Sequence, residues 1–176
     1  MSGAQAGLYP VDGETMNIKK LLQSGEVVRY HNHSGIDKQT LAQHQWGVAM
    51  IVMKIYPHAR TELIMAALTH DCAEYHTGDL PAPVKWSNPA IKLALDEMEN
   101  EWLEEQGVLY VLTDTEQLIL TLADKFEGMW FCIQQMKNGN QAARRPFRLW
   151  HDAVRGLFWK NIPTPACEDM LDLLLT

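Results

Sequence analysis

Three things are scarce in this sequence: cysteine, positive charge and long apolar runs. Its three cysteines, Cys72, Cys132 and Cys167, form no C-x-x-C pair. An odd number of well-separated thiols is typical of a reducing compartment and argues against a disulfide framework. The sequence therefore predicts a cytoplasmic protein with free thiols.

Positive charge is outweighed, because 15 Lys and Arg stand against 22 Asp and Glu, for a formal net charge of −7. Broad, nonspecific binding to nucleic acid needs a basic face, so we expect no nucleic-acid partner. No uninterrupted apolar run approaches the ~20 residues that a membrane helix needs. The N-terminus also lacks the basic-then-apolar pattern of a signal peptide. We expect a soluble protein without a membrane partner.

What the chain does have is helical periodicity over 176 residues, a length that suits one domain with a sizeable core. Apolar residues recur at helical spacing, and no segment shows a convincing strand pattern. The expected fold is all-α, a compact single domain over residues 1–176 with six to eight helices. Irregular segments are expected at 26–35 and 76–88. The expected helices cover residues 15–23, 40–56, 61–75, 89–106, 113–137 and 142–160, with a short one after Pro165.

One stretch organises the chain: residues 66–86, AALTHDCAEYHTGDLPAPVKW. It begins as an apolar helix, which then places His70 beside Asp71. Glu74 follows four residues after His70, so we expect the two side chains on one helix face. A buried His-Asp pair is costly unless something compensates it. A divalent metal ion is the usual compensation, because neutral imidazole and carboxylate are both good ligands.

The missing ligands are found on two other expected helices, which carry His44 and Asp124. Taken singly, a histidine on an apolar helix is more often a core residue, and an aspartate more often pairs locally. Together with His70 and Asp71 they give two imidazoles and two carboxylates. That set suits Zn, Mn, Co, Fe or Ni and leaves positions for water and substrate.

This order of residues, H…HD…D, resembles that of the HD-domain metal-dependent phosphohydrolases. The stretch HDCAEYHTGDLPAPVKW is similar to the HD-x-x-E-x-x-x-G-D-x-P-x-P-x-K pattern of their 5′-deoxynucleotidase branch. Arg29 precedes His44 by 15 residues (44 − 29), as the phosphate-contacting arginine of that branch does. The segment QTLAQHQWGVA resembles the approach to the first histidine in the phage dATP triphosphohydrolases of this group. The resemblance covers about residues 26–135, the motif core of the expected HD domain.

The resemblance implies a role for each matching residue. It makes His44, His70, Asp71 and Asp124 the metal ligands. Glu74 matches the acidic residue that positions or deprotonates the attacking water, and Asp79 matches a second acidic residue near the sugar or the leaving oxygen.

Substrate binding is implied for three more residues. Arg29 and Lys85 match the cations that bind phosphate. Tyr30 stands where the family usually has a tryptophan packed against the deoxyribose, so this chain departs from the pattern there. The implied cofactor is a divalent ion (Zn, Co or Mn), with Mg as a candidate second ion.

The implied reaction is hydrolysis of the 5′ phosphoester of a deoxynucleotide. Attack on the phosphorus next to the 5′ oxygen releases phosphate from a monophosphate and intact triphosphate from a triphosphate, so one site can serve both. We expect dATP as the substrate, with positive charge beyond that phosphorus from Lys125, Arg144, Arg145 and Arg148. The alternatives are a 5′-deoxyribonucleoside monophosphatase and a non-catalytic nucleotide-binding protein. The resemblance and the apolar, Trp-rich C-terminal third also suggest a homo-oligomer.

Overall fold

The computed structural model describes residues 17–161, with the side chains described up to residue 157. Helices dominate this range, which confirms the predicted all-α class. In chain order the elements are α1 (Ile18–Ser24), β1 (Val28–Arg29), β2 (Gln39–Thr40), α2 (Leu41–Ile55), α3 (Thr61–Thr69), α4 (Glu74–Thr77), α5 (Ala82–Ser87), α6 (Pro89–Glu105), α7 (Asp114–Lys137), the 3₁₀ turn η1 (Gln141–Ala143) and α8 (Arg144–Asn161).

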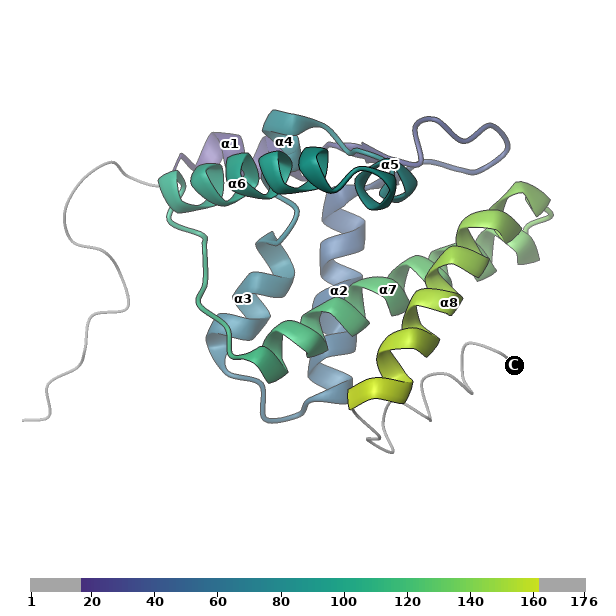
Figure 1. The fold of residues 1–176 in the computed structure, drawn as a ribbon. Coiled ribbons are helices and arrows are strands. Elements are labelled where there is room, and N and C mark those ends of the chain that lie inside the picture. The colour runs from purple at the N-terminus through teal and green to yellow at the C-terminus, as the bar shows by residue number, and fades with distance from the viewer. Residues whose placement is uncertain (1–16, 162–176) are drawn as a thin grey trace, which may run out of the picture.

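The helices form two groups (Figure 1). The short helices α1, α4 and α5 lie in a row with α6 at the top of the view, above α2, α3 and α7, while α8 runs along α7. The core lies between α2, α3 and α7, where Val48, Val52, Leu63 and Ala123 are fully buried. A second apolar cluster, which includes Phe126, joins α7 to α8. Burial of this kind contributes about 25 cal/mol per Å² of apolar surface, so these helices are held mainly by packing.

The two long helices of the site both begin at capping boxes. Thr40 accepts a hydrogen bond from the backbone N–H of Gln43, whose side chain bonds back to the backbone N–H of Thr40. Thr113 and Glu116 form the same reciprocal capping box at the start of α7. Each box satisfies two backbone donors that a helix start would otherwise leave unpaired. The caps fix where α2 and α7 begin, and so which way His44 and Asp124 point from these helices.

The expected continuous helix over 61–75 is wrong. Helix α3 ends at Thr69, and His70 closes it by donating its backbone N–H to Ala66 at 2.8 Å. The next bonds run only three residues back, from Cys72 to Thr69 and from Glu74 to Asp71. Such bonds tighten the chain into a turn, after which α4 starts anew at Glu74. His70 and Glu74 therefore do not share one helix face.

The segments expected to be irregular also contain regular structure. Strands β1 and β2 pair antiparallel, with Arg29 opposite Gln39, and they are too short to show an alternating pattern in the sequence. Within 76–88, α5 starts directly after Pro81, with Pro83 in its first turn, where the missing proline N–H costs nothing. For the same reason Pro146 does not interrupt the first turn of α8.

The structure bears on the predicted free thiols and on the predicted lack of a membrane helix. Cys72 and Cys132 are buried free thiols, whereas Cys167 lies outside the described residues. The expected helix after Pro165 lies outside them as well. Among the helices described, none combines the length and the apolar character that crossing a membrane would take.

Candidate metal centre and its cavities

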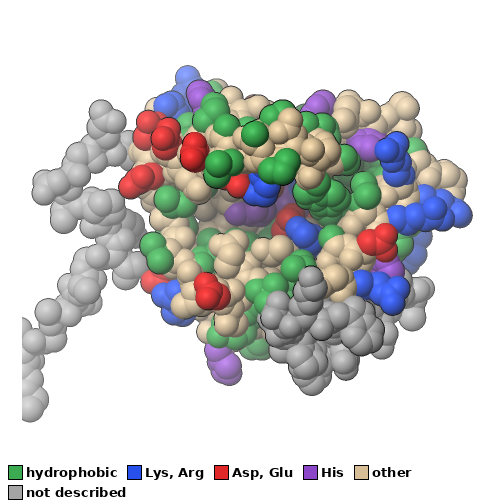
Figure 2. Space-filling model, viewed as in Figure 1, with side chains coloured by type: hydrophobic (Ala, Val, Ile, Leu, Met, Phe, Trp, Pro, Cys, Tyr) green, Lys and Arg blue, Asp and Glu red, His purple; other side chains and the backbone are tan. Residues whose placement is uncertain are grey.

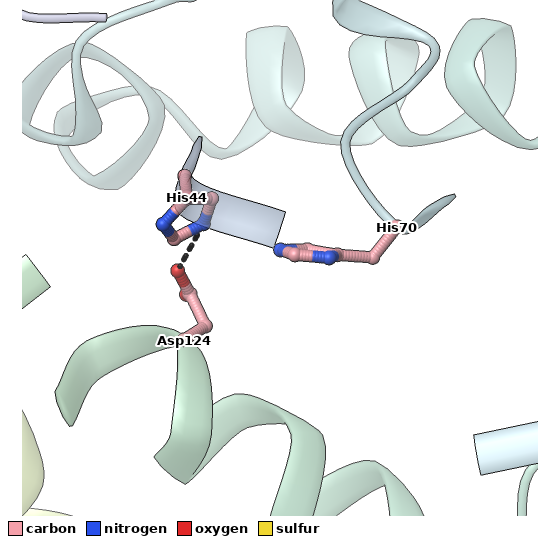
Figure 3. Close-up of side chains that lie close together, drawn as sticks. All are labelled: His44, His70 and Asp124. Carbon is pink, nitrogen blue, oxygen red and sulfur yellow. Dashed lines mark ion pairs between the residues drawn. The ribbon is translucent and has the colours of Figure 1, made fainter. Parts of the chain in front are cut away.

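The four predicted metal ligands converge at one point between α2, the end of α3 and α7. His44 projects from α2 and Asp124 from α7, and His70 is the residue that closes α3 (Figure 3). One ligand atom from each of these three lies within 4.8 Å of the others. Asp71 completes the set, with Oδ2 3.5 Å from Nε2 of His44 and 3.3 Å from Nε2 of His70. The other carboxylate, Asp124, places Oδ1 3.3 Å from His44 Nε2.

The hydrogen bonds of the two imidazoles leave the right nitrogens free for a metal. Nε2 of His44 and Nε2 of His70 are both buried without a hydrogen-bond partner among the described residues. Their other nitrogens are engaged: His70 Nδ1 lies 3.0 Å from the carbonyl oxygen of Ala67, and His44 Nδ1 lies 2.5 Å from Glu127 Oε2. Because a carbonyl oxygen only accepts, Nδ1 of His70 carries the proton and Nε2 presents its lone pair. These residues fit a divalent ion.

The electrostatics of the cluster also favour a cation. Burial acts to raise the pKa of Asp71, but the neighbouring His70 and His44 hold it well below its usual range. Burial likewise acts to raise the pKa of Asp124, but the neighbouring His44 and Lys125 lower it. Burial and Arg29 lower the pKa of His44, but Asp124, Asp71 and Glu127 outweigh them and raise it to about 10. A divalent ion can replace that proton, since metal ligands bind in their deprotonated form.

Glu74 faces the same point from the start of α4. Only 5% of the residue is exposed, its Oε1 lies 3.6 Å from Nζ of Lys85, and its Oε2 is buried without a hydrogen-bond partner in the part of the chain that the structure describes. Burial raises the pKa of Glu74 to about 9, with Asp71 and Asp79 adding to the rise and Lys85 and Arg29 opposing it. A buried carboxyl group with an unpartnered oxygen beside a metal cluster is a good candidate for holding and passing a proton.

The cluster opens into a small cavity of about 190 Å³, here called the metal cavity. Its walls carry the acidic residues Asp71, Glu74, Asp79 and Asp124 and three cations, Arg29, Lys85 and Lys125. Figure 2 shows His, acidic and basic side chains gathered in the hollow between the α6 row and the helices below it. Arg29 is 8% exposed and stays charged, because nearby acidic groups raise its pKa although burial lowers it. Mixed charge of this kind suits an anion held next to a metal ion.

A second cavity of about 410 Å³, here called the wide cavity, adjoins the first. Arg29, Asp79, Ala82 and Trp150 line both. The remaining wall of the wide cavity is mostly apolar or aromatic, with Tyr30, Pro81, Pro83, Val84 and Leu149. Rings and prolines around a concave space with few polar groups are typical of a site for a flat organic group.

Tyr30 is held in an unusual backbone conformation in the wall of the wide cavity. Its φ is 56°, in the left-handed region that non-glycine residues avoid. A residue in that region costs on the order of 1 kcal/mol or more and is found where surrounding structure enforces it. Here the ring stacks on Phe131 with centroids 4.9 Å apart and an interplanar angle of 20°, and the residue is 8% exposed. Packing of the ring on Phe131 thus holds Tyr30 in the cavity wall in spite of the backbone strain.

Of the four cations expected beyond the reacting phosphorus, the structure brings only some to the cavities. Lys125 lines the metal cavity, with Nζ 3.5 Å from Asp124 Oδ2 and 5.7 Å from the centroid of the Trp150 ring. Of the three arginines, Arg145 lines the wide cavity, whereas Arg144 and Arg148 are exposed and line neither cavity. The structure thus brings one arginine of the cluster, and not all three, to the site.

Sequence reasoning missed two groups at the site. Glu127 contacts His44 from the interior of α7, and Trp150 forms a wall of both cavities from α8. Glu127 does have a signature: it lies three residues after Asp124, and Gly47 lies three residues after His44. At helical spacing these positions face each other across α2 and α7. Because the sequence alone does not show that α2 packs on α7, a glutamate on such a long helix is predicted to face solvent.

An all-α fold with two histidines and two aspartates around one point, beside a cationic cavity, defines a metal-dependent phosphohydrolase of the HD type. Residues 19–115, more than half of the chain, match the family model described as 5′-deoxynucleotidase YfbR-like. The chain belongs to this family, which confirms the resemblance seen in its motifs.

Individual relatives extend the match. The chain is 33% identical to a dATP triphosphohydrolase of Salmonella phage PMBT28, over 88% of this chain and 91% of that protein. It is 36% identical over 90 residues to a 5′-deoxynucleotidase of Pasteurella multocida (strain Pm70), covering 46% of this chain and 44% of the relative. The solved structure of the cyanophage S-2L HD phosphohydrolase (DatZ), bound to dA and one catalytic Zn²⁺ ion, has the same fold. Its TM-score is 0.68 at 19% identity, over 88% of this chain and 91% of DatZ.

Proposed function

We propose that this protein is a zinc-dependent hydrolase that converts dATP and water to deoxyadenosine and triphosphate. The observation that carries the proposal is that one small cavity beside the metal cluster brings two of its ligands, Asp71 and Asp124, together with three cations, Arg29, Lys85 and Lys125. The adjoining wide cavity offers apolar and aromatic walls for a nucleoside. The match to a dATP triphosphohydrolase along 91% of its length supports the triphosphate over the monophosphate.

The cations have separate tasks in binding. Arg29 presents a planar guanidinium that can hold two phosphate oxygens at once, and its pairing with Gln39 in the hairpin fixes the backbone below it. Lys85 supplies a point charge next to Glu74. Lys125 supplies a third cation from α7, which supports a role in binding the phosphates beyond the reacting one. A substrate with a single phosphate would have less need of it.

In the hydrolysis, an oxygen from water bonds to the phosphorus next to the 5′ oxygen, the bond from that phosphorus to the 5′ oxygen breaks, and the 5′ oxygen takes a proton. A divalent ion on His44, His70, Asp71 and Asp124 would supply positive charge that acidifies a water and neutralises a phosphoryl oxygen. Glu74 accepts the proton of the attacking water at Oε2, the oxygen that has no hydrogen-bond partner among residues whose side chains are described.

The leaving group is handled where the two cavities meet. Asp79 lines both cavities, which supports a role between the phosphate in the metal cavity and the nucleoside in the wide cavity. Its Oδ2 lies 3.6 Å from Nδ1 of His31. We infer that Asp79 contacts the 5′ oxygen or the sugar, and that Tyr30 packs against the deoxyribose.

The proposal is tested by incubating zinc-loaded protein with dATP and with dAMP separately and resolving the products by ion-exchange chromatography. Deoxyadenosine with intact triphosphate from dATP, and slow or no turnover of dAMP, is the expected result. Phosphate from dAMP with dATP untouched would make the protein a 5′-deoxyribonucleoside monophosphatase. No product from any deoxynucleotide with Zn, Co or Mn, or with Mg added as a second ion, would favour a non-catalytic nucleotide-binding protein.

We also propose that the chain forms a homo-oligomer. Exposed aromatic and thioether side chains support this, because Trp46 and Met50 on α2 and Trp130 on α7 line one groove together. Light scattering after size exclusion measures the mass, and a monomer at all concentrations would contradict the proposal. A cytoplasmic location and the absence of a nucleic-acid partner stay predictions.

A further inference from the structure

Glu127 is a buried carboxylate that no step of the proposed hydrolysis uses. It lies on α7, three residues after Asp124, and is 4% exposed. Burying a carboxylate is costly unless hydrogen bonds compensate the loss of water, so its contacts ought to reveal why it is there. Glu127 contacts both a metal ligand and the hairpin that carries Arg29.

The first contact is to a metal ligand. Glu127 Oε2 lies 2.5 Å from Nδ1 of His44, and both side chains are almost fully buried. A carboxylate only accepts, so Nδ1 of His44 must carry the proton and donate it. The other ring nitrogen, Nε2, then faces Asp71 and Asp124, as Figure 3 shows for Asp124. Carboxylate partners of this kind orient a ligating imidazole and raise its basicity.

The second contact is to the hairpin that carries the phosphate-binding arginine. Glu127 Oε1 accepts a hydrogen bond of 2.6 Å from Nε2 of Gln39, a residue that is 4% exposed. Gln39 is the register partner of Arg29 in the β1–β2 pair. Arg29 itself places Nη1 4.0 Å from Glu127 Oε2. A single carboxylate thus contacts a metal ligand, the arginine and the strand beside the arginine.

The surrounding chain leaves room for this carboxylate. A Cβ atom at Gly47 would lie 2.7 Å from Cγ of Glu127, closer than real Cβ contacts come. Gly47 is on α2, one turn after His44, so the same helix supplies the ligand and the space for the group that orients it. The Glu127 side chain is therefore confined to the position in which it meets His44.

We propose that Glu127 is a positioning residue that sets the tautomer of His44 and, through Gln39 and Arg29, ties the metal ligand to the phosphate-binding hairpin. The role assigned to Arg29 rests on the proposed hydrolysis, whereas the action on His44 rests on the metal cluster alone. Two substitutions separate the action on His44 from the link to the hairpin. Glu127→Gln removes the charge that faces both His44 and the hairpin, whereas Gln39→Ala removes only the link to the hairpin.

The test measures zinc affinity by competition with a chromogenic chelator, without nucleotide, alongside kcat and KM. Glu127→Gln is expected to raise the zinc Kd by about 10- to 100-fold. Gln39→Ala is expected to leave the zinc Kd within about twofold and to raise KM for the nucleotide. Glu116→Gln is the matched control: Glu116 is another buried carboxylate of α7, bonded to Arg60 and Thr113 away from the cluster. It should lower thermal stability and leave zinc binding unchanged.

Two further readouts keep the inference open to refutation. If Glu127→Gln does not fold, Glu127→Asp retains the charge but shortens the reach to His44, and an intermediate zinc Kd is expected. Long-range ¹H–¹⁵N spectra of the imidazoles should show a proton on Nδ1 of His44 in the wild type. A zinc Kd within twofold of the wild type in the folded Glu127 variants, or His44 with its proton on Nε2 in zinc-loaded protein, would overturn the inference. Because zinc binding needs no substrate, an inactive protein would refute the proposed hydrolysis and leave this result standing.

Discussion

The metal cluster has two halves that are built differently. His44 and Asp124 stand on α2 and α7, two long helices that pack through buried apolar side chains and begin at capping boxes. His70 and Asp71 stand in the tight turn that closes α3. Glu74 and Lys85 stand on the short helices α4 and α5, and Asp79 lies in the segment between them.

The two halves are therefore suited to different tasks. The long-helix half can hold a metal ligand to within a narrow geometry, because packing and hydrogen bonds fix each rotamer. The short-element half presents its groups to the two cavities, where a substrate must enter and leave. Substitutions of the ligands should therefore act on the metal, and those of Glu74, Asp79 and Lys85 on turnover and substrate binding. The first two of four predictions, given in order of decreasing effect, test this division.

The largest effect is expected from Asp124→Asn in the long-helix half. The change removes a charged ligand and leaves the shape almost intact, so zinc binding should be largely lost and kcat/KM should fall by about a thousandfold or more. Zinc content by mass spectrometry and turnover of dATP measure the two effects. Asp114→Asn, at an exposed position on the same helix, is the control and should retain both.

Glu74→Gln in the short-element half should separate turnover from the metal. If Glu74 accepts the proton of the attacking water, kcat should fall by about 10²- to 10⁴-fold while the zinc Kd stays within about twofold. Glu101→Gln, on the exposed face of α6, is the control. A zinc Kd that rises as much as in Asp124→Asn would make Glu74 a ligand and erase the distinction between the halves.

Lys125→Met removes the cation that α7 contributes to the metal cavity and should affect binding more than turnover. Loss of one charge-assisted contact to the substrate corresponds to a rise in KM of about tenfold for dATP. Arg144→Ala and Arg148→Ala serve as controls, because both side chains are exposed and line neither cavity. Equal effects from these arginines would mean that the triphosphate runs along α8 and not past Lys125.

The smallest effect concerns the ion pair that joins the starts of α3 and α7. Arg60 donates two hydrogen bonds to Glu116, at 2.8 and 2.7 Å, and this pair lowers the pKa of Glu116 from 4.5 to about 2. A carboxyl group with a depressed pKa stabilises the fold above its unfolded value of 4.5, and that stability is lost as the pH falls toward 2.

Arg60→Ala should therefore lower the melting temperature by a few degrees at pH 7 and much less at pH 3, where the wild type has already lost part of the benefit. Differential scanning calorimetry at both pH values measures this. Arg60 is half exposed, so solvent weakens the pair, and an equal loss at the two pH values would show that the arginine acts through packing alone.

Much of this architecture could be predicted from residues that act locally. Thr40 and Thr113 mark the starts of α2 and α7, and the apolar stripe from Leu118 to Met136 marks the face of α7. The four ligands were predicted as one set, and they do lie together, although their roles stay predictions. The turn after Thr69 could not be predicted, because its residues are compatible with a helix and tertiary packing decides. Glu127 was missed because its partner, His44, is 83 residues away in the chain.

The most direct test of the central claim is hydrolysis of dATP by zinc-loaded protein in ¹⁸O-labelled water, with mass spectrometry of both products. The account predicts one ¹⁸O atom in the released triphosphate, on the phosphorus that was next to the 5′ oxygen, and none in deoxyadenosine. Label in deoxyadenosine, or release of dAMP with labelled pyrophosphate, would place the attack elsewhere and contradict the account.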